Sequence, residues 1–242
     1  MKLNEVIKNT IIQNQAPIGF DEFMQLALYY PQLGYYRSGS EKFGEKGDFV
    51  TAPETSDLFG FCLARQCAQV LNGDNDILEF GAGSGVLAAQ VLFELGRLEC
   101  LPKCYYILEL SGELQHRQQQ TIAKALPELL ERVVWLDKLP ERFNGVVIAN
   151  EVLDAMPAKR LIQKQGKFHE LCVDLDKDQL NWRSDETVFE KSAIKLPVNV
   201  VEGYTTEINP RAMAWIDSLY GALDEALVLL IDYGMHRDEY FH

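Results

Sequence analysis

The sequence predicts an α/β fold in which helices cover a mostly parallel, doubly wound sheet. Short apolar runs, typical of buried strands, alternate along the chain with longer segments whose apolar residues recur at helical spacing. A glycine-rich turn at 81–85 follows the first run and predicts a strand-to-helix connection. The run Gly145-Val-Val-Ile-Ala149 is apolar throughout, as expected for a strand buried on both faces. These three features together predict a Rossmann-like sheet.

An N-terminal extension precedes this pattern. Residues 2–14 carry apolar side chains at helical spacing and predict an amphipathic helix. A second helix is expected from a cap at Asp21 up to Pro31, which cannot continue it. Residues 34–56 combine glycine, proline, aromatic and acidic residues, as functional loops do more often than plain linkers. We therefore predict that residues 1–56 form a helical extension with a loop that covers a cofactor.

The main domain is predicted over residues 57–242. Its expected helices cover residues 57–71, 85–96, 111–125 and 209–222, and its expected strands cover 76–80, 104–109, 132–136, 144–149 and 226–231. Two alternating segments, Arg160–Gln165 and Lys167–Asp174, flank Gly166 and predict a β-hairpin. This hairpin, within residues 160–175, interrupts the βα rhythm and is expected as an insertion.

Charge and cysteine usage limit the function classes. The chain has 242 residues, 36 acidic and 23 basic, and its net charge of −13 disfavours sustained contact with nucleic acid. A cationic protein segment is the partner that this charge favours, although solubility alone also explains such acidity. No apolar stretch approaches the roughly 18 residues of a membrane span and no export signal is evident, so a cytoplasmic location is expected. The five cysteines form no Cys-x-x-Cys pair and the four histidines are scattered, which predicts reduced thiols and no metal site.

The glycine turn carries the clearest ligand signal. Glu79 ends an apolar run, and Gly81, Gly83 and Gly85 follow it. Glycine reaches positive φ at little cost and lets a ligand approach the backbone. A dinucleotide fingerprint would place its third glycine where this chain has Val86. The acid before the glycines instead suits a ligand with a cationic amino-acid end, such as S-adenosyl-L-methionine; a nicotinamide or flavin cofactor, or a turn that binds nothing, are the alternatives.

A second carboxylate lies one βαβ step later. Glu109 follows the apolar run 105–108, at the strand end where open parallel sheets bind their ligands. A carboxylate there can accept hydrogen bonds from both ribose hydroxyls. Both NAD and S-adenosylmethionine contain such a ribose, so Glu109 supports a pocket without selecting the cofactor. In isolation, Glu109 would be interpreted as a solvated strand end.

Acidic residues also follow the strand at 144–149. Glu151 and Asp154 are three residues apart, so one helical turn would place both carboxylates on one side. Two acids there could hold a guanidinium group while one of its nitrogens turns a lone pair toward a methyl donor. A helix start capped by Asn150 and Glu151 explains the same residues equally well.

Six blocks in the same order resemble the MidA-like family of S-adenosylmethionine-dependent methyltransferases. They are Pro31-x-x-Gly-Tyr-Tyr36, Gly47-Asp-Phe-Val-Thr-Ala-Pro-Glu54, Glu79-x-Gly-Ala-Gly-Ser-Gly85, Ile107-Leu-Glu-Leu-Ser111, Asn150-Glu-Val-Leu-Asp-Ala-Met-Pro157 and Ile231-Asp-Tyr-Gly234. The resemblance implies a class I methyltransferase fold with S-adenosyl-L-methionine as cofactor. Mitochondrial members are protein arginine methyltransferases that act on a complex I subunit and assist assembly of that complex, so the resemblance also implies a protein substrate.

The resemblance further implies a role for individual residues. The implied cofactor-binding set is Glu79, Gly81, Ala82, Gly83 and Gly85 around the methionine part, Glu109, Leu110 and Ser111 around the ribose, and Thr51 and Pro53 in the loop that closes over the ligand. Asn150, Glu151 and Asp154 would border the reacting methyl group. Transfer would be direct, because the methyl group is already activated and the protein need only align a nitrogen and exclude water.

The C-terminal end departs from the family pattern. Family members usually continue beyond the Asp-Tyr-Gly block, whereas this sequence ends at Tyr240-Phe241-His242. We therefore expect two strands to be missing and a sheet edge to be exposed, which would favour association into a homo-oligomer. Two other functions stay open: a noncatalytic assembly factor that binds S-adenosylmethionine, and an NAD-binding oxidoreductase.

Overall fold

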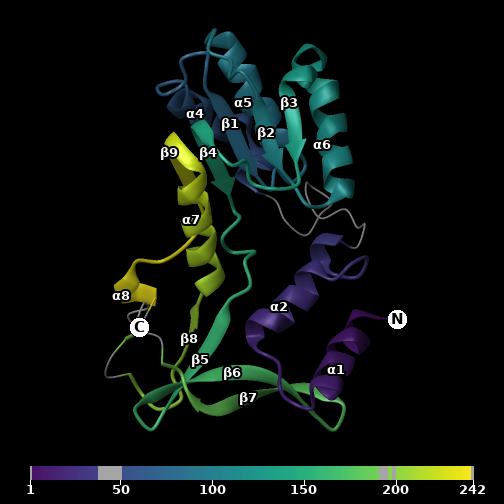
Figure 1. Ribbon diagram of the computed structural model, residues 1–242, viewed down its shortest axis with the longest axis vertical. Helices are drawn as coiled ribbons and strands as arrows, with labels where there is room; N and C mark the ends of the chain where they lie inside the picture. Colours follow the sequence, from purple (N-terminus) through teal and green to yellow (C-terminus); the bar gives the residue numbers. More distant parts are fainter. Residues whose placement is uncertain (1, 38–50, 191–195, 198–199, 241–242) are drawn as a thin grey trace. The chain divides into compact units, whose positions relative to one another are not determined.

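The computed structural model describes residues 2–37, 51–190, 196–197 and 200–240. The chain forms two compact units, each discontinuous in sequence (Figure 1). The antiparallel unit comprises Met1–Ser38, Ala155–Trp215 and Gly234–His242, and the parallel unit comprises Gly39–Asp154 and Ile216–Tyr233. These bounds differ from the sequence-based division at residue 56, because the N-terminal helices pack with the hairpin insertion.

A five-stranded parallel sheet forms the centre of the parallel unit. Its strands are β1 (Asp76–Phe80), β2 (Tyr105–Leu108), β3 (Val133–Leu136), β4 (Phe143–Asn150) and β9 (Leu223–Ile231), in the order β3-β2-β1-β4-β9. Every neighbouring pair is parallel. The predicted Rossmann-like fold is confirmed, and β9 lies at one edge of this sheet.

The parallel unit contains helices that correspond to the four predicted at 57–71, 85–96, 111–125 and 209–222, and two short helices at 52–55 and 127–132 that were not predicted. They are α3 (Ala52–Thr55), α4 (Asp57–Cys67), α5 (Val86–Arg97), α6 (Gly112–Ala125), the 3-10 helix η2 (Pro127–Arg132) and α7 (Pro210–Ala222), which has residues in both units. Leu92 and Leu95 of α5 and Ile122 of α6 are fully buried and pack with Ile77 and Ile107 of the sheet. This apolar core holds the carboxyl ends of the strands in place for the site described below.

The antiparallel unit contains the second sheet. Its strands are β5 (Lys159–Lys164), β6 (Lys167–Asp176), β7 (Gln179–Val188) and β8 (Thr205–Ile208), in the order β7-β6-β5-β8. The predicted hairpin is β5 and β6, which pair antiparallel. Strand β7 was not predicted because most of its side chains are exposed and polar, and strand β8 was not predicted because three of its four residues, Thr205, Thr206 and Glu207, are polar.

Helices α1 (Leu3–Asn14) and α2 (Phe20–Tyr29) also belong to the antiparallel unit, as do two short helices, η1 (Tyr35–Arg37) and α8 (Arg237–Tyr240). The predicted first helix is confirmed. The predicted cap at Asp21 is wrong, because Gly19 caps α2 and Asp21 lies in its first turn. A Cβ atom on Gly19 would lie 2.5 Å from Asp21 Oδ1 and 2.8 Å from Glu170 Oε1, so glycine makes room for these carboxylates.

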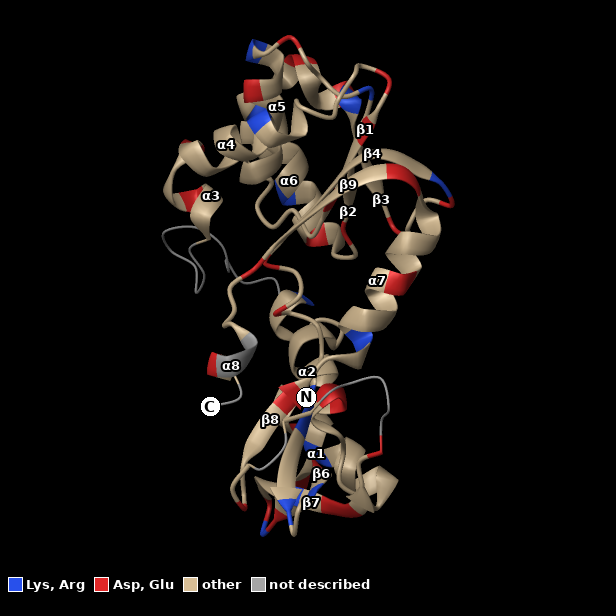
Figure 2. Cartoon of the chain, turned by 90° about the vertical axis from the view of Figure 1, so that its left-hand side faces the viewer, with Lys and Arg blue, Asp and Glu red and all other residues tan. Residues whose placement is uncertain are grey.

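Acidic residues are distributed over more of the described chain than basic ones (Figure 2), in agreement with the net charge of −13. None of the helices within the described ranges is both long enough and apolar enough to span a membrane.

Candidate active site

The glycine turn links β1 to α5 through backbone conformations that favour glycine. Gly81, Gly83 and Gly85 have φ values of 59°, 53° and 85°. Side chains with a Cβ adopt this left-handed region at a cost of about 1 kcal/mol or more, so three such positions within five residues select glycine. Helix α5 begins at Val86 with Gly85 as its N-cap, one residue later than the expected start at residue 85.

Gly85 faces the neighbouring helix α6. A Cβ atom on Gly85 would lie 2.9 Å from the Cα atom of Gln118, and backbone at that distance cannot give way without moving the helix. Gly85 therefore allows α6 to approach the turn. Its implied contact with the cofactor stays a prediction, whereas its contact with α6 is a feature of the fold.

Glu79 is buried at the carboxyl end of β1. Its side chain is 2% exposed, and the Tyr105 hydroxyl donates a hydrogen bond of 2.8 Å to Oε2. Burial raises the pKa of Glu79 to about 7, an effect that the Tyr105 hydrogen bond opposes and the nearby Glu109 charge reinforces. A buried carboxylate in this state is suited to receive a cationic group.

Glu109 follows β2 and is held from two sides. The backbone N–H of Ser111 donates to Oε1 over 2.9 Å, and the amide Nε2 of Gln118 donates to Oε2 over 3.2 Å. Ser111 is also the N-cap of α6, accepting from Leu114 N. Leu110, between these residues, is 64% exposed and presents an apolar surface beside the carboxylate. Each carboxylate oxygen can accept more than one hydrogen bond, as recognition of two ribose hydroxyls requires.

Gln118 is a site residue that sequence reasoning missed. It has no exposed surface, although a glutamine within an amphipathic helix is ordinarily solvated. The available signal was its position one helical turn before Ile122, which is also buried, on the inner face of α6.

The N-terminal loop contacts the glycine turn through α3. Gln90 of α5 donates from Nε2 to the Pro53 carbonyl over 2.9 Å, and the Ser84 hydroxyl donates to the Glu54 carboxylate. Pro53 is buried, and Thr51 is the N-cap of α3. The rest of the block that begins at Gly47, residues 47–50, lies outside the described residues.

The segment after β4 differs from its prediction. Neither the helical turn nor the capped helix start forms, and Glu151 adopts a left-handed φ of 51°. Asp232, which follows β9, accepts hydrogen bonds at Oδ2 from Leu153 N (3.0 Å) and Asp154 N (3.2 Å). The Asp232 carboxylate thus accepts hydrogen bonds from the N–H groups that would lie at the start of a helix, and it stabilises residues 151–154 as a loop.

Three carboxylates and a tyrosine gather at this loop. The Tyr233 hydroxyl donates to Asp154 Oδ2 over 2.6 Å, and this hydrogen bond raises the pKa of Tyr233 to about 12. Partial burial raises the pKa of Glu151, and the charges of Asp154 and Asp232 raise it further. Such a cluster attracts a cation. Asp232 and Tyr233 belong to the sequence block Ile231–Gly234, but they were not predicted as site residues.

Strand register brings these groups together at the carboxyl ends of the strands. Phe80 is paired with Leu108 on one side and with Ala149 on the other, and Asn150 is paired with Ile231. A Cβ atom on Gly81 would lie only 3.8 Å from Val152 Cγ2, so the glycine turn and the segment after β4 are in close proximity. Asn150 ends β4 at the same end of the sheet, and Ala82 is buried in the turn.

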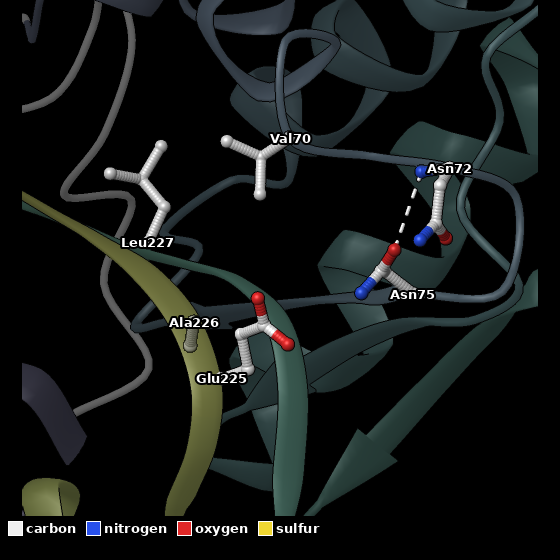
Figure 3. Close-up of a pocket in the computed structure, with 6 residues that line it drawn as sticks. All are labelled: Val70, Asn72, Asn75, Glu225, Ala226 and Leu227. Carbon is white, nitrogen blue, oxygen red and sulfur yellow. Dashed lines mark hydrogen bonds between the residues drawn. The ribbon is translucent and has the colours of Figure 1, made fainter.

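A hollow of about 340 Å³ lies elsewhere in the parallel unit (Figure 3). Its lining residues are Val70, Asn72, Asn75, Glu225, Ala226 and Leu227. Asn75 directly precedes β1 and Glu225 lies near the start of β9, so the hollow is at the amino ends of the strands. Open parallel sheets bind their ligands at the opposite, carboxyl ends, and we assign this hollow no catalytic role. In the described ranges, no three His, Cys, Asp or Glu side chains are grouped as a metal site would require.

Comparison with solved structures identifies similar folds. The chain superimposes on a COG1565 superfamily member from Burkholderia thailandensis, solved bound to S-adenosyl-homocysteine, with a TM-score of 0.93 and 39% identity over 99% of this chain and 64% of that one. A second structure from the same organism gives a TM-score of 0.89 and 37% identity, covering 99% of this chain and 63% of that one.

Curated relatives are more distant. The Drosophila melanogaster protein arginine methyltransferase NDUFAF7 homolog, mitochondrial, is 29% identical over 68% of this chain and 43% of its own length. The Mus musculus protein arginine methyltransferase NDUFAF7, mitochondrial, is 29% identical over 68% of this chain and 44% of its own length. The chain thus spans less than half the length of these relatives.

A family profile described as "Putative S-adenosyl-L-methionine-dependent methyltransferase" matches residues 62–242. This match and the structural neighbour bound to S-adenosyl-homocysteine confirm the predicted family and its cofactor, S-adenosyl-L-methionine. The chain therefore belongs to the MidA-like family of S-adenosyl-L-methionine-dependent methyltransferases.

Proposed function

We propose that this protein transfers a methyl group from S-adenosyl-L-methionine to an arginine side chain of a protein. One observation carries the proposal. The glycine turn, the Glu109 carboxylate and the acidic loop after β4 all lie at the carboxyl ends of the parallel strands. The first two suit the cofactor and the third suits a cationic acceptor. The arginine assignment is supported by the names of the mitochondrial relatives and by the acidity of the loop.

The residues of the parallel unit fit the proposed cofactor. The backbone of Gly81 and Gly83 has no side chain that would block an approaching ligand. Buried Glu79 matches a cationic amino group, because binding of such a group would favour the ionised carboxylate that burial disfavours. We assign Glu109 to the ribose hydroxyls and exposed Leu110 to the apolar face of the adenine.

The cofactor, when bound, supplies an activated methyl group. The protein then has to hold the acceptor nitrogen in line with that group and exclude water. We propose that the carboxylates of Glu151 and Asp154 hold the guanidinium, with Asn150 beside them. Formation of the nitrogen–carbon bond would break the methyl–sulfur bond and release S-adenosylhomocysteine. The acceptor nitrogen would then lose a proton, and Glu151, whose pKa is raised, is the carboxylate we assign to accept it.

Calorimetric titration with S-adenosylhomocysteine tests the cofactor part of the proposal. The wild-type protein should bind S-adenosylhomocysteine and not NADH, and Glu109→Ala should weaken this binding strongly while leaving a measurable affinity. NADH binding would support an oxidoreductase instead. Failure of both ligands to bind would refute the assigned pocket.

Transfer is tested with radiolabelled S-adenosylmethionine and a peptide that carries one arginine among neutral residues. We expect label on the arginine peptide and none on its lysine counterpart. Binding of S-adenosylhomocysteine without transfer to this peptide or to any protein of a cell lysate would support a noncatalytic assembly factor. The resemblance to mitochondrial members makes subunits of a respiratory complex the first proteins to examine by mass spectrometry.

A further inference from the structure

One buried side chain connects the two halves of the proposed cofactor pocket. Gln118 of α6 donates from Nε2 to the Gly83 carbonyl over 3.1 Å and to Glu109 Oε2 over 3.2 Å. Its Oε1 accepts a hydrogen bond of 2.9 Å from Trp135 Nε1. Gly83 follows β1, Glu109 follows β2 and Trp135 lies in β3, so one amide joins the ends of three adjacent strands.

The chemistry of Trp135 determines which way this amide faces. An indole N–H can only donate, so the amide oxygen of Gln118 must face Trp135. The amide nitrogen then faces the opposite way, and its two N–H bonds meet two acceptors, the Gly83 carbonyl and the Glu109 carboxylate. The donor and acceptor groups of the buried amide are therefore all matched, and its orientation is unique.

The close approach of α6 keeps Gln118 at this place. The Cα atom of Gln118 lies 2.9 Å from where a Cβ atom of Gly85 would be, so the missing side chain of Gly85 sets the distance between helix and turn. A residue with a Cβ at position 85 would push Gln118 away from both of its acceptors.

We infer that Gln118 is a positioning residue for the cofactor, acting through Glu109 and Gly83. It fixes the Oε2 side of the Glu109 carboxylate, while Ser111 N fixes Oε1, so the orientation of the carboxylate plane is set from both sides. It also sets the distance between this carboxylate and the glycine turn. The inference rests on the proposed function, since it assumes that S-adenosylmethionine binds at the carboxyl ends of the strands.

A double-mutant cycle with S-adenosylhomocysteine tests this inference. Gln118→Leu should weaken binding about tenfold, the effect of one or two lost hydrogen bonds to a charged group. In the Glu109→Ala background, the same substitution should change the remaining affinity by less than about twofold, because a residue that acts through Glu109 has no effect without it. The matched control is Ile122→Val, which loosens the packing of the same helix and should leave the affinity unchanged.

A second variant keeps Gln118 in place. Trp135→Phe removes the donor that orients the amide and should weaken S-adenosylhomocysteine binding about threefold. In the NMR spectrum of the folded Gln118→Leu variant, the indole N–H resonance of Trp135 should shift relative to wild type. In the Ile122→Val control this resonance should keep its wild-type position.

The outcomes separate the inference from the proposed function. Wild-type affinity in Gln118→Leu, or equal fold-losses from that substitution with and without Glu109, would overturn the inference while the pocket stands. Absence of binding to the wild-type protein would overturn the proposed cofactor pocket and this inference with it. If Gln118→Leu fails to fold, an unchanged affinity in Trp135→Phe overturns the inference.

Discussion

The cofactor side and the acceptor side of the proposed site are built in different ways. On the cofactor side, Glu79 and Glu109 are buried at strand ends, and side chains of the core, Tyr105 and Gln118, hold their carboxylates. On the acceptor side, Asp154 and Tyr233 are exposed and belong to segments outside regular structure.

This difference follows from what each side would bind. A cofactor of fixed shape can be recognised by a rigid pocket that is continuous with the core. A protein side chain arrives attached to a larger partner, so the groups that receive it have to be accessible. Changes on the cofactor side should therefore disturb folding and affinity together, whereas changes on the acceptor side should disturb turnover alone.

The largest effect is expected from Gly85→Ala. The new Cβ atom would lie 2.9 Å from Gln118 Cα, and the residue would keep a φ of 85°. We expect a loss of roughly 3 kcal/mol or more in the free energy of unfolding, from backbone strain and displacement of α6 together. Urea denaturation measures this loss.

The matched control for this variant is Gly73→Ala. Gly73 has a similar φ of 87°, but a Cβ atom there would have no neighbour within 4 Å. Only the strain of the left-handed backbone applies, so a loss of about 1 kcal/mol is expected. Equal losses in the two variants would show that contact with α6 does not constrain the turn.

On the acceptor side, Glu151→Gln should lower kcat about 100-fold, the order of magnitude for losing a charged group at a reacting centre. The affinity for S-adenosylhomocysteine should stay within about twofold of wild type, because Glu151 is assigned to the acceptor. Asp217→Asn removes one exposed acidic charge from α7 and is the control for net charge. Parallel losses of turnover and cofactor affinity in Glu151→Gln would instead make this carboxylate structural.

The same contrast explains what could be predicted from the sequence. The glycine turn and Glu109 could be predicted because they depend on residues close together in the sequence. The turn requires positive φ at three of five positions, and Glu109 directly follows an apolar strand. The loop after β4 depends on Asp232, 78 residues from Asp154, so the spacing of Glu151 and Asp154 wrongly predicted a helical turn. Gln118 was missed for a similar reason, because its partners Gly83, Glu109 and Trp135 follow or lie in three different strands, and its position one helical turn before Ile122 indicates burial without indicating these partners.

Cofactor affinity should depend on pH through Glu79. Its pKa is raised from 4.5 to about 7, and a cationic amino group would favour the ionised form, so binding below pH 7 requires release of a proton. Affinity for S-adenosylhomocysteine should fall as pH decreases below about 7, by at most about tenfold per pH unit. Glu79→Gln should flatten this dependence, and a profile unchanged by that substitution would exclude Glu79 as its source.

The effect of Glu79 on folding has the opposite sign. Because the folded-state pKa lies above 4.5, the folded protein holds this proton more tightly than the unfolded chain between about pH 4.5 and 7. The contribution of Glu79 to stability is therefore fully present below about pH 4.5 and is lost as pH rises through 7. Comparing wild type with Glu79→Gln by urea denaturation at pH 5 and pH 8 isolates this contribution from that of other groups.

The smallest effect is expected from Tyr233→Phe. This substitution removes the 2.6 Å hydrogen bond to Asp154, but both groups are exposed and water can replace the hydroxyl. We expect kcat to fall about threefold, with cofactor affinity unchanged. Because the pKa of Tyr233 is about 12, its hydroxyl remains a donor at pH 6.5 and at pH 8.5 alike, and the ratio of mutant to wild-type kcat should be equal at the two values. A loss as large as that of Glu151→Gln would mean that Tyr233 itself contacts the acceptor, and the acceptor side would then be as rigidly organised as the cofactor side.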